Sequence, residues 1–113
     1  SSAAEAIERI VDVFEGPKQR QVLIQLAAVL RGVVSQVLLP KAGGGRIAAR
    51  EVLVNTPAVA NLIRENNIAQ IKSVLQTNAK DGMIPMEVAI KELVKEKLIE
   101  KETAEAFAAG THV

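Results

Sequence analysis

Apolar side chains return every three or four residues in the first thirty positions, which is the spacing of helices that bury one side. The first such stripe predicts a helix over 3–14. A glycine and a proline at 16–17 end it and start a second stripe, because proline suits the first turn of a helix. The second helix is expected to end near 31–32, at an arginine followed by a glycine.

The pattern then changes to two runs of β-branched and apolar residues, at 33–39 and 46–54, which favour strands. Gly43–Gly45 lie between them, and glycine readily adopts the positive φ that a hairpin connection needs. A phosphate-binding loop would instead require a lysine and a serine or threonine after its last glycine, and then a helix. A strand-like run follows here, so we predict an antiparallel hairpin.

Helical patterns return after the hairpin. Thr56 and Pro57 are typical of a capped helix start, and this helix is expected over 57–65. The stripe at 68–75 predicts the next helix. A loop is expected at 78–85 because of its Asn, Asp, Gly and Pro content, and two further helices are predicted at 86–98 and 102–109.

The composition argues against several functional classes. With 14 basic and 13 acidic side chains the net charge is +1, so no strong field attracts nucleic acid. The sequence has no cysteine, and its one histidine, His112, cannot build a metal cluster alone. No apolar run approaches the ~20 residues that cross a bilayer. We therefore expect a soluble, cytosolic protein with no nucleic-acid partner and no membrane-embedded segment.

Three further groups of side chains have ordinary structural interpretations. Arg46 and Arg50 are interpreted as solvated edge charges rather than as groups that reach a neighbour's phosphates. Met83 and Met86 are expected to fill gaps in the core. The lysines near the C-terminus alternate with glutamates, which is typical of a mixed, solvated face; they are Lys91, Lys95, Lys97 and Lys101.

Five blocks of the sequence, in this order, resemble the C-terminal half of the ATPase domain of type IV pilus retraction motors, the PilT family. The blocks are AAEAIERIVDVF, QLAAVLRGVVSQVLLP, GRIAAREVLVNTPAVANLIRE, QIKSVLQT and GMIPMEVAIKEL. The most distinctive resemblance is to the family's Ala-Ile-Arg-Asn-Leu-Ile-Arg-Glu signature. This retraction signature is met here as Ala58, Val59, Ala60, Asn61, Leu62, Ile63, Arg64 and Glu65. Val59 stands in place of isoleucine and Ala60 in place of arginine, so one positive charge is missing.

The resemblance implies an α/β fold, or α+β for this piece alone, from the C-terminal part of a RecA-like P-loop NTPase domain. Residues 1–55 would end the ATPase core with two helices and a β-hairpin, and 56–113 would form a helical C-terminal subdomain. The family's proteins are hexameric motors that use ATP and Mg²⁺ to withdraw pilin subunits from the pilus, which drives twitching motility. They work in the bacterial cytoplasm, at the inner face of the cytoplasmic membrane and against a pilus platform in it.

In that family the phosphate-binding loop, the acidic residues that position magnesium and a histidine-containing box all lie upstream of the segment matched here. The resemblance therefore implies no catalytic, cofactor-binding or metal-binding residue in this chain, and ATP binding by this part alone is not expected. It implies instead a contact role for the retraction signature, in which the exposed Asn61, Arg64 and Glu65 relay the movement of the motor.

Two alternatives stay open: a pilus-assembly or type II secretion ATPase of the same superfamily, and a stand-alone helical module that binds proteins or DNA. The sequence also gives an expectation about neighbours. Because the chain begins at Ser1 and a capping pattern follows at once, we expect it to be part of a longer protein. The hairpin would then have lost neighbouring strands, so self-association or exchange of elements between copies is expected.

Overall fold

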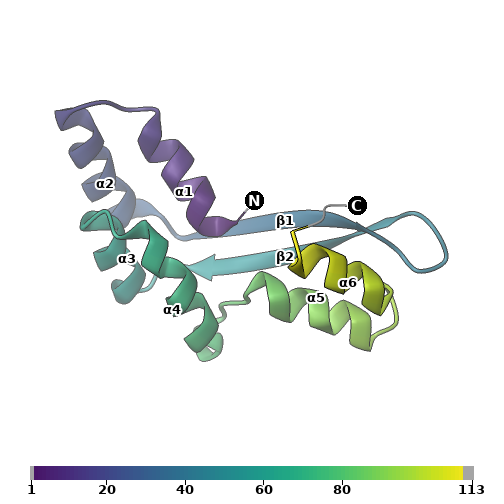
Figure 1. Ribbon diagram of the computed structural model, residues 1–113. Coiled ribbons are helices and arrows are strands. Elements are labelled where there is room, and N and C mark those ends of the chain that lie inside the picture. Colours follow the sequence, from purple (N-terminus) through teal and green to yellow (C-terminus); the bar gives the residue numbers. More distant parts are fainter. Residues whose placement is uncertain (1, 111–113) are drawn as a thin grey trace.

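A long β-hairpin is the axis along which the helices are arranged (Figure 1). The computed structural model describes residues 2–110. In chain order the elements are α1 (Ala3–Asp12), α2 (Pro17–Val29), β1 (Gly32–Pro40), β2 (Arg46–Val54), α3 (Pro57–Arg64), α4 (Ile71–Thr77), α5 (Met86–Lys95) and α6 (Lys101–Ala108). Helices α1 to α4 gather at the open end of the hairpin, and α5 and α6 lie along its other half.

The hairpin forms where the apolar runs predicted it. Its two strands, of nine residues each, pair antiparallel along their whole length. At the tip Gly43–Gly45 have positive φ values of 87°, 118° and 78°, a region that glycine adopts without a steric cost. The N–H of Ala42 donates to the carbonyl of Leu98 at 2.8 Å, which ties the tip to the connection between α5 and α6. The glycines therefore form the predicted bend.

The two faces of the hairpin differ in burial. Successive side chains of a strand project to opposite faces, and the odd-numbered positions of both strands face the helices. The buried residues of this inner face are Ser35, Leu39, Ala49, Glu51 and Leu53. On the outer face, the side chains of Val34 and Leu38 are 63% and 45% exposed. The helices of residues 2–110 thus leave the outer face of β1 largely uncovered.

Buried side chains form two separate clusters along the hairpin. The base cluster joins α1 to α4 to the end of β2 and consists of Ala3, Ile7, Val11, Leu23, Ala27, Leu53, Val59, Ala60, Ile63, Ile68, Ile71, Leu75 and Met83. The distal cluster joins α5 and the segment before α6 to the far half of the hairpin and consists of Leu39, Ala49, Met86, Ile90 and Ile99. The two methionines lie in these clusters, so the prediction that they fill the core is confirmed.

Two predicted helix starts are confirmed by their caps. The Ser2 hydroxyl accepts a hydrogen bond from the N–H of Glu5 (3.2 Å) at the start of α1. The Thr56 hydroxyl accepts one from the N–H of Val59 (3.4 Å), and Pro57 is the first residue of α3. Each hydroxyl satisfies an amide that has no partner within its own helix. Local sequence therefore decides where these helices begin.

The predicted ends of the first two helices are wrong by two residues. The first helix ends at Asp12. The second ends at Val29, since Leu30 is already extended with a ψ of 132°. The side-chain amide of Asn55, at the end of β2, donates to the carbonyls of Ala27 (3.1 Å) and Leu30 (2.8 Å). This contact from a distant element fixes the place where α2 stops and β1 follows.

Helix α5 is also shorter than predicted. The pattern predicts a helix through residue 98, yet α5 ends at Lys95, because Lys97 adopts a left-handed conformation with a φ of 62°. The N–H groups of Lys97 and Leu98 donate to the carbonyls of Val94 and Leu93, both at 2.9 Å. This is a Schellman motif, whose left-handed position is usually a glycine. A lysine at that position gives no local signal of the helix end.

Between α3 and α5 the chain is less regular than predicted. The helix predicted over 68–75 is a 3₁₀ turn, Ile68–Gln70, followed by α4. The predicted loop at 78–85 contains a second 3₁₀ turn, Ala79–Asp81. Beyond that turn, Ile84 and Val52 exchange two backbone hydrogen bonds of 2.9 Å. This short bridge covers part of the outer edge of β2.

Candidate functional site

Helix α3 carries the retraction signature, and its orientation follows from the burial of one side. Val59, Ala60 and Ile63 lie in the base cluster, with exposed fractions of 0%, 9% and 0%. Leu62 is half-buried against the same cluster. The exposed members of the signature are Ala58, Asn61, Arg64 and Glu65, which are named the α3 row below. The exposure predicted for the three polar residues is confirmed.

Two members of the α3 row are hydrogen-bonded to each other. Nη2 of Arg64 donates to Oδ1 of Asn61 at 2.6 Å, across one helical turn. This bond orients the guanidinium group. Its other N–H groups, and the amide N–H₂ of Asn61, make no hydrogen bond within residues 2–110. The row therefore presents donors whose positions are set by the helix itself.

The C-terminal end of α3 sets where the row stops. Asn66 adopts a left-handed conformation with a φ of 58°, which asparagine tolerates better than most residues. Its N–H donates to the carbonyl of Ile63 (3.0 Å), and the N–H of Asn67 donates to that of Leu62 (2.8 Å). The helix therefore ends at Arg64, one residue before its predicted end, and Glu65 is its C-cap.

A groove of about 460 Å³ lies beside the α3 row. One wall is α3, with Asn61 and Glu65, and the other is formed by Gln70, Ser73 and Val74 from the turn before α4 and from α4 itself. The half-buried Leu62 also lines the groove. Polar groups around a small apolar patch are the usual composition of a protein contact site. The sequence could indicate the row, but not the second wall.

Ala60, which departs from the family signature, lies on the buried side of α3. Its side chain is part of the base cluster, which also contains residues of α2. An arginine at this position would have to extend its stem along that packed surface to bring its charge to water. The alanine therefore changes the surface around the base cluster as well as the charge, whereas the α3 row keeps its polar side chains.

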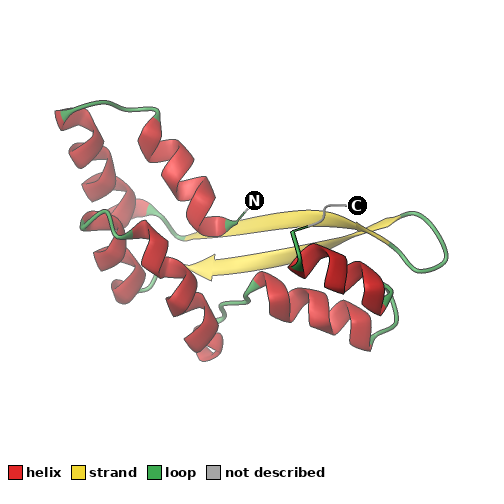
Figure 2. Ribbon diagram, viewed as in Figure 1, coloured by secondary structure: helices red, strands yellow, loops and turns green. Residues whose placement is uncertain are grey.

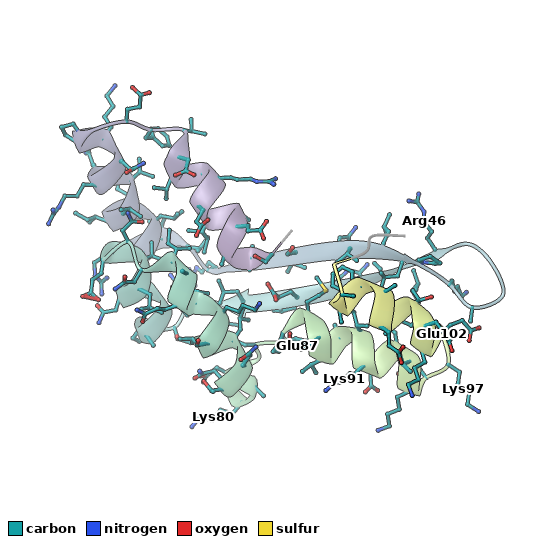
Figure 3. The ribbon with its side chains drawn as sticks, viewed as in Figure 1. Arg46, Lys80, Glu87, Lys91, Lys97 and Glu102 are labelled. Carbon is teal, nitrogen blue, oxygen red and sulfur yellow. The ribbon has the colours of Figure 1, made fainter. Side chains whose placement is uncertain are left out.

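The other charged candidates lie on the surface. Arg46 and Arg50 are exposed on β2 and make no ion pair within residues 2–110, which agrees with their interpretation as solvated edge charges. Figure 3 shows Arg46 near the tip of the hairpin, far along β2 from α3. The four lysines of the predicted mixed face are all exposed; they are Lys91, Lys95, Lys97 and Lys101. None of these groups lies beside the α3 row.

Glu51 makes buried contacts that the sequence pattern did not indicate. It is only 7% exposed, and its carboxylate joins two helices. Oε1 accepts from the N–H of Ala3 (2.9 Å), and Oε2 accepts from the N–H of Met86 (3.2 Å). These amides belong to the first residues of α1 and α5, where the helix dipole favours a negative charge. A glutamate at an inward position of a strand could have indicated such a role.

A second cavity does not fit a nucleotide. A cleft of about 630 Å³ lies between α5, α6 and the start of α1, with apolar side chains such as Ile90, Val94 and Phe107 in its lining. Its charged lining residues are three lysines and four glutamates: Lys72, Lys91, Lys101, Glu5, Glu51, Glu87 and Glu105. This balance does not favour a triphosphate. The glycine loop does not form a phosphate-binding site either, because it leads into β2 and not into a helix.

The described residues contain neither a metal-binding cluster nor a membrane-spanning helix. Within residues 2–110 no group of three or more His, Cys, Asp and Glu side chains is arranged to hold a metal ion. Over the same range no helix is both long and apolar enough to cross a membrane. His112 lies outside the described residues.

Comparison with known proteins connects this chain to pilus ATPases. No family model matches it. It is 44% identical over 104 residues to the type IV pilus retraction ATPase PilT of Pseudomonas aeruginosa, a match that covers 92% of this chain and 30% of that protein. It is 46% identical over 112 residues to a twitching motility protein of Neisseria gonorrhoeae, covering 98% of this chain and 30% of that one.

A solved structure gives the same result for the fold. The pilus retraction motor PilT, crystallised with bound ADP, superposes with a TM-score of 0.76 at 43% identity. The match covers 90% of this chain and 28% of that one. The α/β fold class predicted from the sequence is thus confirmed.

Proposed function

We propose that this chain, which is related to the type IV pilus retraction ATPases over nearly its whole length, forms the C-terminal part of a motor that hydrolyses ATP to retract pili. The observation that carries the proposal is the retraction signature, whose exposed row stands on a well-packed helix. The chain spans about 30% of the length of the curated relatives that it matches. The ATPase activity is therefore assigned to a longer protein that contains this chain.

Within that motor the α3 row serves as a contact that passes movement to a neighbouring part. Three features support this role. Val59 and Ile63 are fully buried, so the helix cannot shift without disturbing the base cluster. The bond between Arg64 and Asn61 holds the exposed guanidinium in place, with further N–H groups that a partner can use. The adjacent groove has room for a side chain of that partner, and its Glu65 supplies an acceptor.

The remaining properties of the parent protein are proposed on the same relationship. It is a hexamer that uses ATP with Mg²⁺, and it works in the cytoplasm at the inner face of the bacterial membrane against the pilus platform. Residues 1–55 complete its ATPase core, and 56–113 form the C-terminal subdomain. Because the described residues do not fit a nucleotide, this part holds no ATP by itself.

Ala60 favours a second candidate function, a pilus-assembly or type II secretion ATPase of the same superfamily. The residue removes one charge from the signature that distinguishes retraction motors. The two functions differ in the direction of pilus movement. Loss of the gene would leave cells with many pili that cannot retract in the first case, and with no pili in the second.

The experiment that tests the retraction contact is Arg64→Ala in the full-length protein. The variant removes the bond to Asn61 and the exposed guanidinium, but it leaves the base cluster unchanged. We expect twitching to be abolished while the rate of ATP hydrolysis stays close to that of the wild type. Arg50→Ala, which removes an exposed arginine from β2, is the matched control and should twitch normally. An equal loss of twitching and hydrolysis in Arg64→Ala would contradict the proposed role.

A further inference from the structure

The α3 row carries one positive charge beside a groove that carries none. Helices α3 and α4 are neighbours at the open end of the hairpin (Figure 2), and the groove of about 460 Å³ lies between them. Apart from the acidic Glu65 its lining is uncharged; the other lining residues are Ala58, Asn61, Leu62, Gln70, Ser73 and Val74. Arg64 is therefore the one basic side chain of the α3 row and the groove together.

The guanidinium of Arg64 keeps enough donors for a contact through two hydrogen bonds. An arginine side chain has five N–H groups, and one hydrogen of Nη2 goes to Oδ1 of Asn61 at 2.6 Å. Whichever Nη2 hydrogen is used, the other one still forms a parallel pair with Nε–H or with Nη1–H. Such a pair matches the two oxygens of a carboxylate. The amide N–H₂ of Asn61 is a further, neutral donor beside it.

The surroundings of this charge favour one kind of anion over others. A nucleic acid or an anionic lipid surface presents many negative charges, and its binding requires several basic groups. In the α3 row a single guanidinium lies next to the carboxylate of Glu65, which would repel such a polyanion. One guanidinium is matched by one carboxylate. The charge of the row thus fits an acidic side chain of a protein.

The groove adds an apolar part to the same contact. Leu62 and Val74 line it, and both are half-buried because they also pack against the base cluster. An aliphatic side chain in the groove would cover them and would exclude water from the neighbouring guanidinium. Hydrogen bonds between charged groups are stronger where water is excluded. The apolar and the charged parts of the contact would therefore support each other.

We propose that the neighbouring part of the motor presents an acidic side chain, which binds the Arg64 guanidinium through two parallel hydrogen bonds. Beside it the same part presents an aliphatic side chain, which lies in the groove on Leu62 and Val74. The inference rests on the proposed function, since it names the chemistry of the partner at the retraction contact. It does not require the α3 row to be exposed in the longer protein, because any segment that covers the row has to match the same charge and the same groove.

Asn61→Asp separates this contact from a structural role. The aspartate still accepts from Arg64 and forms an ion pair with it across one helical turn, so α3 should be at least as stable as before. Its charge would also neutralise the guanidinium and repel the carboxylate of the partner. We expect the full-length protein with Asn61→Asp to lose twitching, while hydrogen exchange in α3 becomes no faster. Gln21→Glu is the matched control, because it makes the same amide-to-carboxylate change at an exposed position of α2, and it should twitch normally.

The results distinguish a failure of this inference from a failure of the proposed function. Normal twitching of Asn61→Asp, together with its loss in Arg64→Ala, would overturn the acidic partner and leave the retraction contact in place. Normal twitching of Arg64→Ala would contradict both. Arg64→Lys keeps the charge but lacks parallel donors, so it should recover little of the lost twitching. Full recovery by the lysine would contradict the contact through two hydrogen bonds.

Arg64→Glu can identify the acidic residue of the partner. The variant reverses the charge, so it should not twitch, and cells that regain twitching can be selected from it. We expect such cells to carry a second change elsewhere in the motor, from Asp or Glu to Lys or Arg, because the reversed pair attracts again. The same acidic residue changed alone should abolish twitching. A saturating selection that yields no acidic-to-basic change would overturn the inference.

Discussion

The base cluster and the distal cluster hold their helices in different ways. The base cluster contains thirteen buried residues, including the fully buried Ile7, Ile63 and Ile71, and it joins four helices. The distal cluster contains five, and α6 has no buried residue of its own. Because local stability follows the density of buried contacts, the base should open only with global unfolding. The α5–α6 end should open more readily.

This difference explains the position of the candidate contact. A surface that relays movement has to belong to a rigid part of the molecule. Helix α3 meets this requirement because its buried side chains pack in the base cluster. Glu51 connects the two regions, because its carboxylate bonds to the first amide of α1 in the base and to that of α5 at the distal side. Substitutions in each region should therefore have different effects.

The largest effect is expected from Ile63→Ala in the base cluster. The side chain is fully buried, so the variant loses its transfer free energy and leaves a cavity, at a cost of about 3–4 kcal/mol in the free energy of unfolding. Ile99→Ala removes the same atoms from the distal cluster, where fewer neighbours surround the site. There we expect about 2 kcal/mol, with faster hydrogen exchange confined to α5 and α6. Equal losses in urea denaturation would contradict the difference between the clusters.

A smaller effect is expected from Glu51→Gln. The amide N–H₂ group would replace one oxygen and face a backbone N–H, which leaves a buried donor without an acceptor, at a cost of about 2 kcal/mol. Because the glutamine keeps one carbonyl oxygen, the first amide of either α1 or α5, which lie 48 and 35 residues from Glu51, should lose its acceptor and exchange faster. Glu65→Gln, an exposed change, is the control and should alter stability by less than about 0.5 kcal/mol. Unchanged exchange at both helix starts would contradict the role of Glu51 in holding them.

The elements that could be predicted from the sequence are those decided by nearby residues. Ser2 and Thr56 mark helix starts because their hydroxyls bond to amides three residues away. The alternation of side chains and the three glycines predict the hairpin. The end of α5 could not be predicted, because a lysine takes the left-handed position that glycine usually occupies.

The candidate site likewise has some features that the sequence predicts and others that it does not. Helical periodicity alone places Asn61, Arg64 and Glu65 on one exposed side, and the structure bears this out. The groove beside them depends on the packing of α4, and the role of Glu51 depends on two partners that are distant in sequence. No local pattern specifies such tertiary contacts, so the sequence could identify the helix but not the shape of its surroundings.

Isothermal titration of ATP and Mg²⁺ into the 113-residue chain tests the proposal that this chain provides contacts in a longer motor protein whose nucleotide is bound elsewhere. The glycine loop leads into a strand, and the charged lining of the cleft contains more glutamates than lysines. We therefore predict no heat beyond that of dilution. Saturable binding with a micromolar Kd would contradict this division of roles.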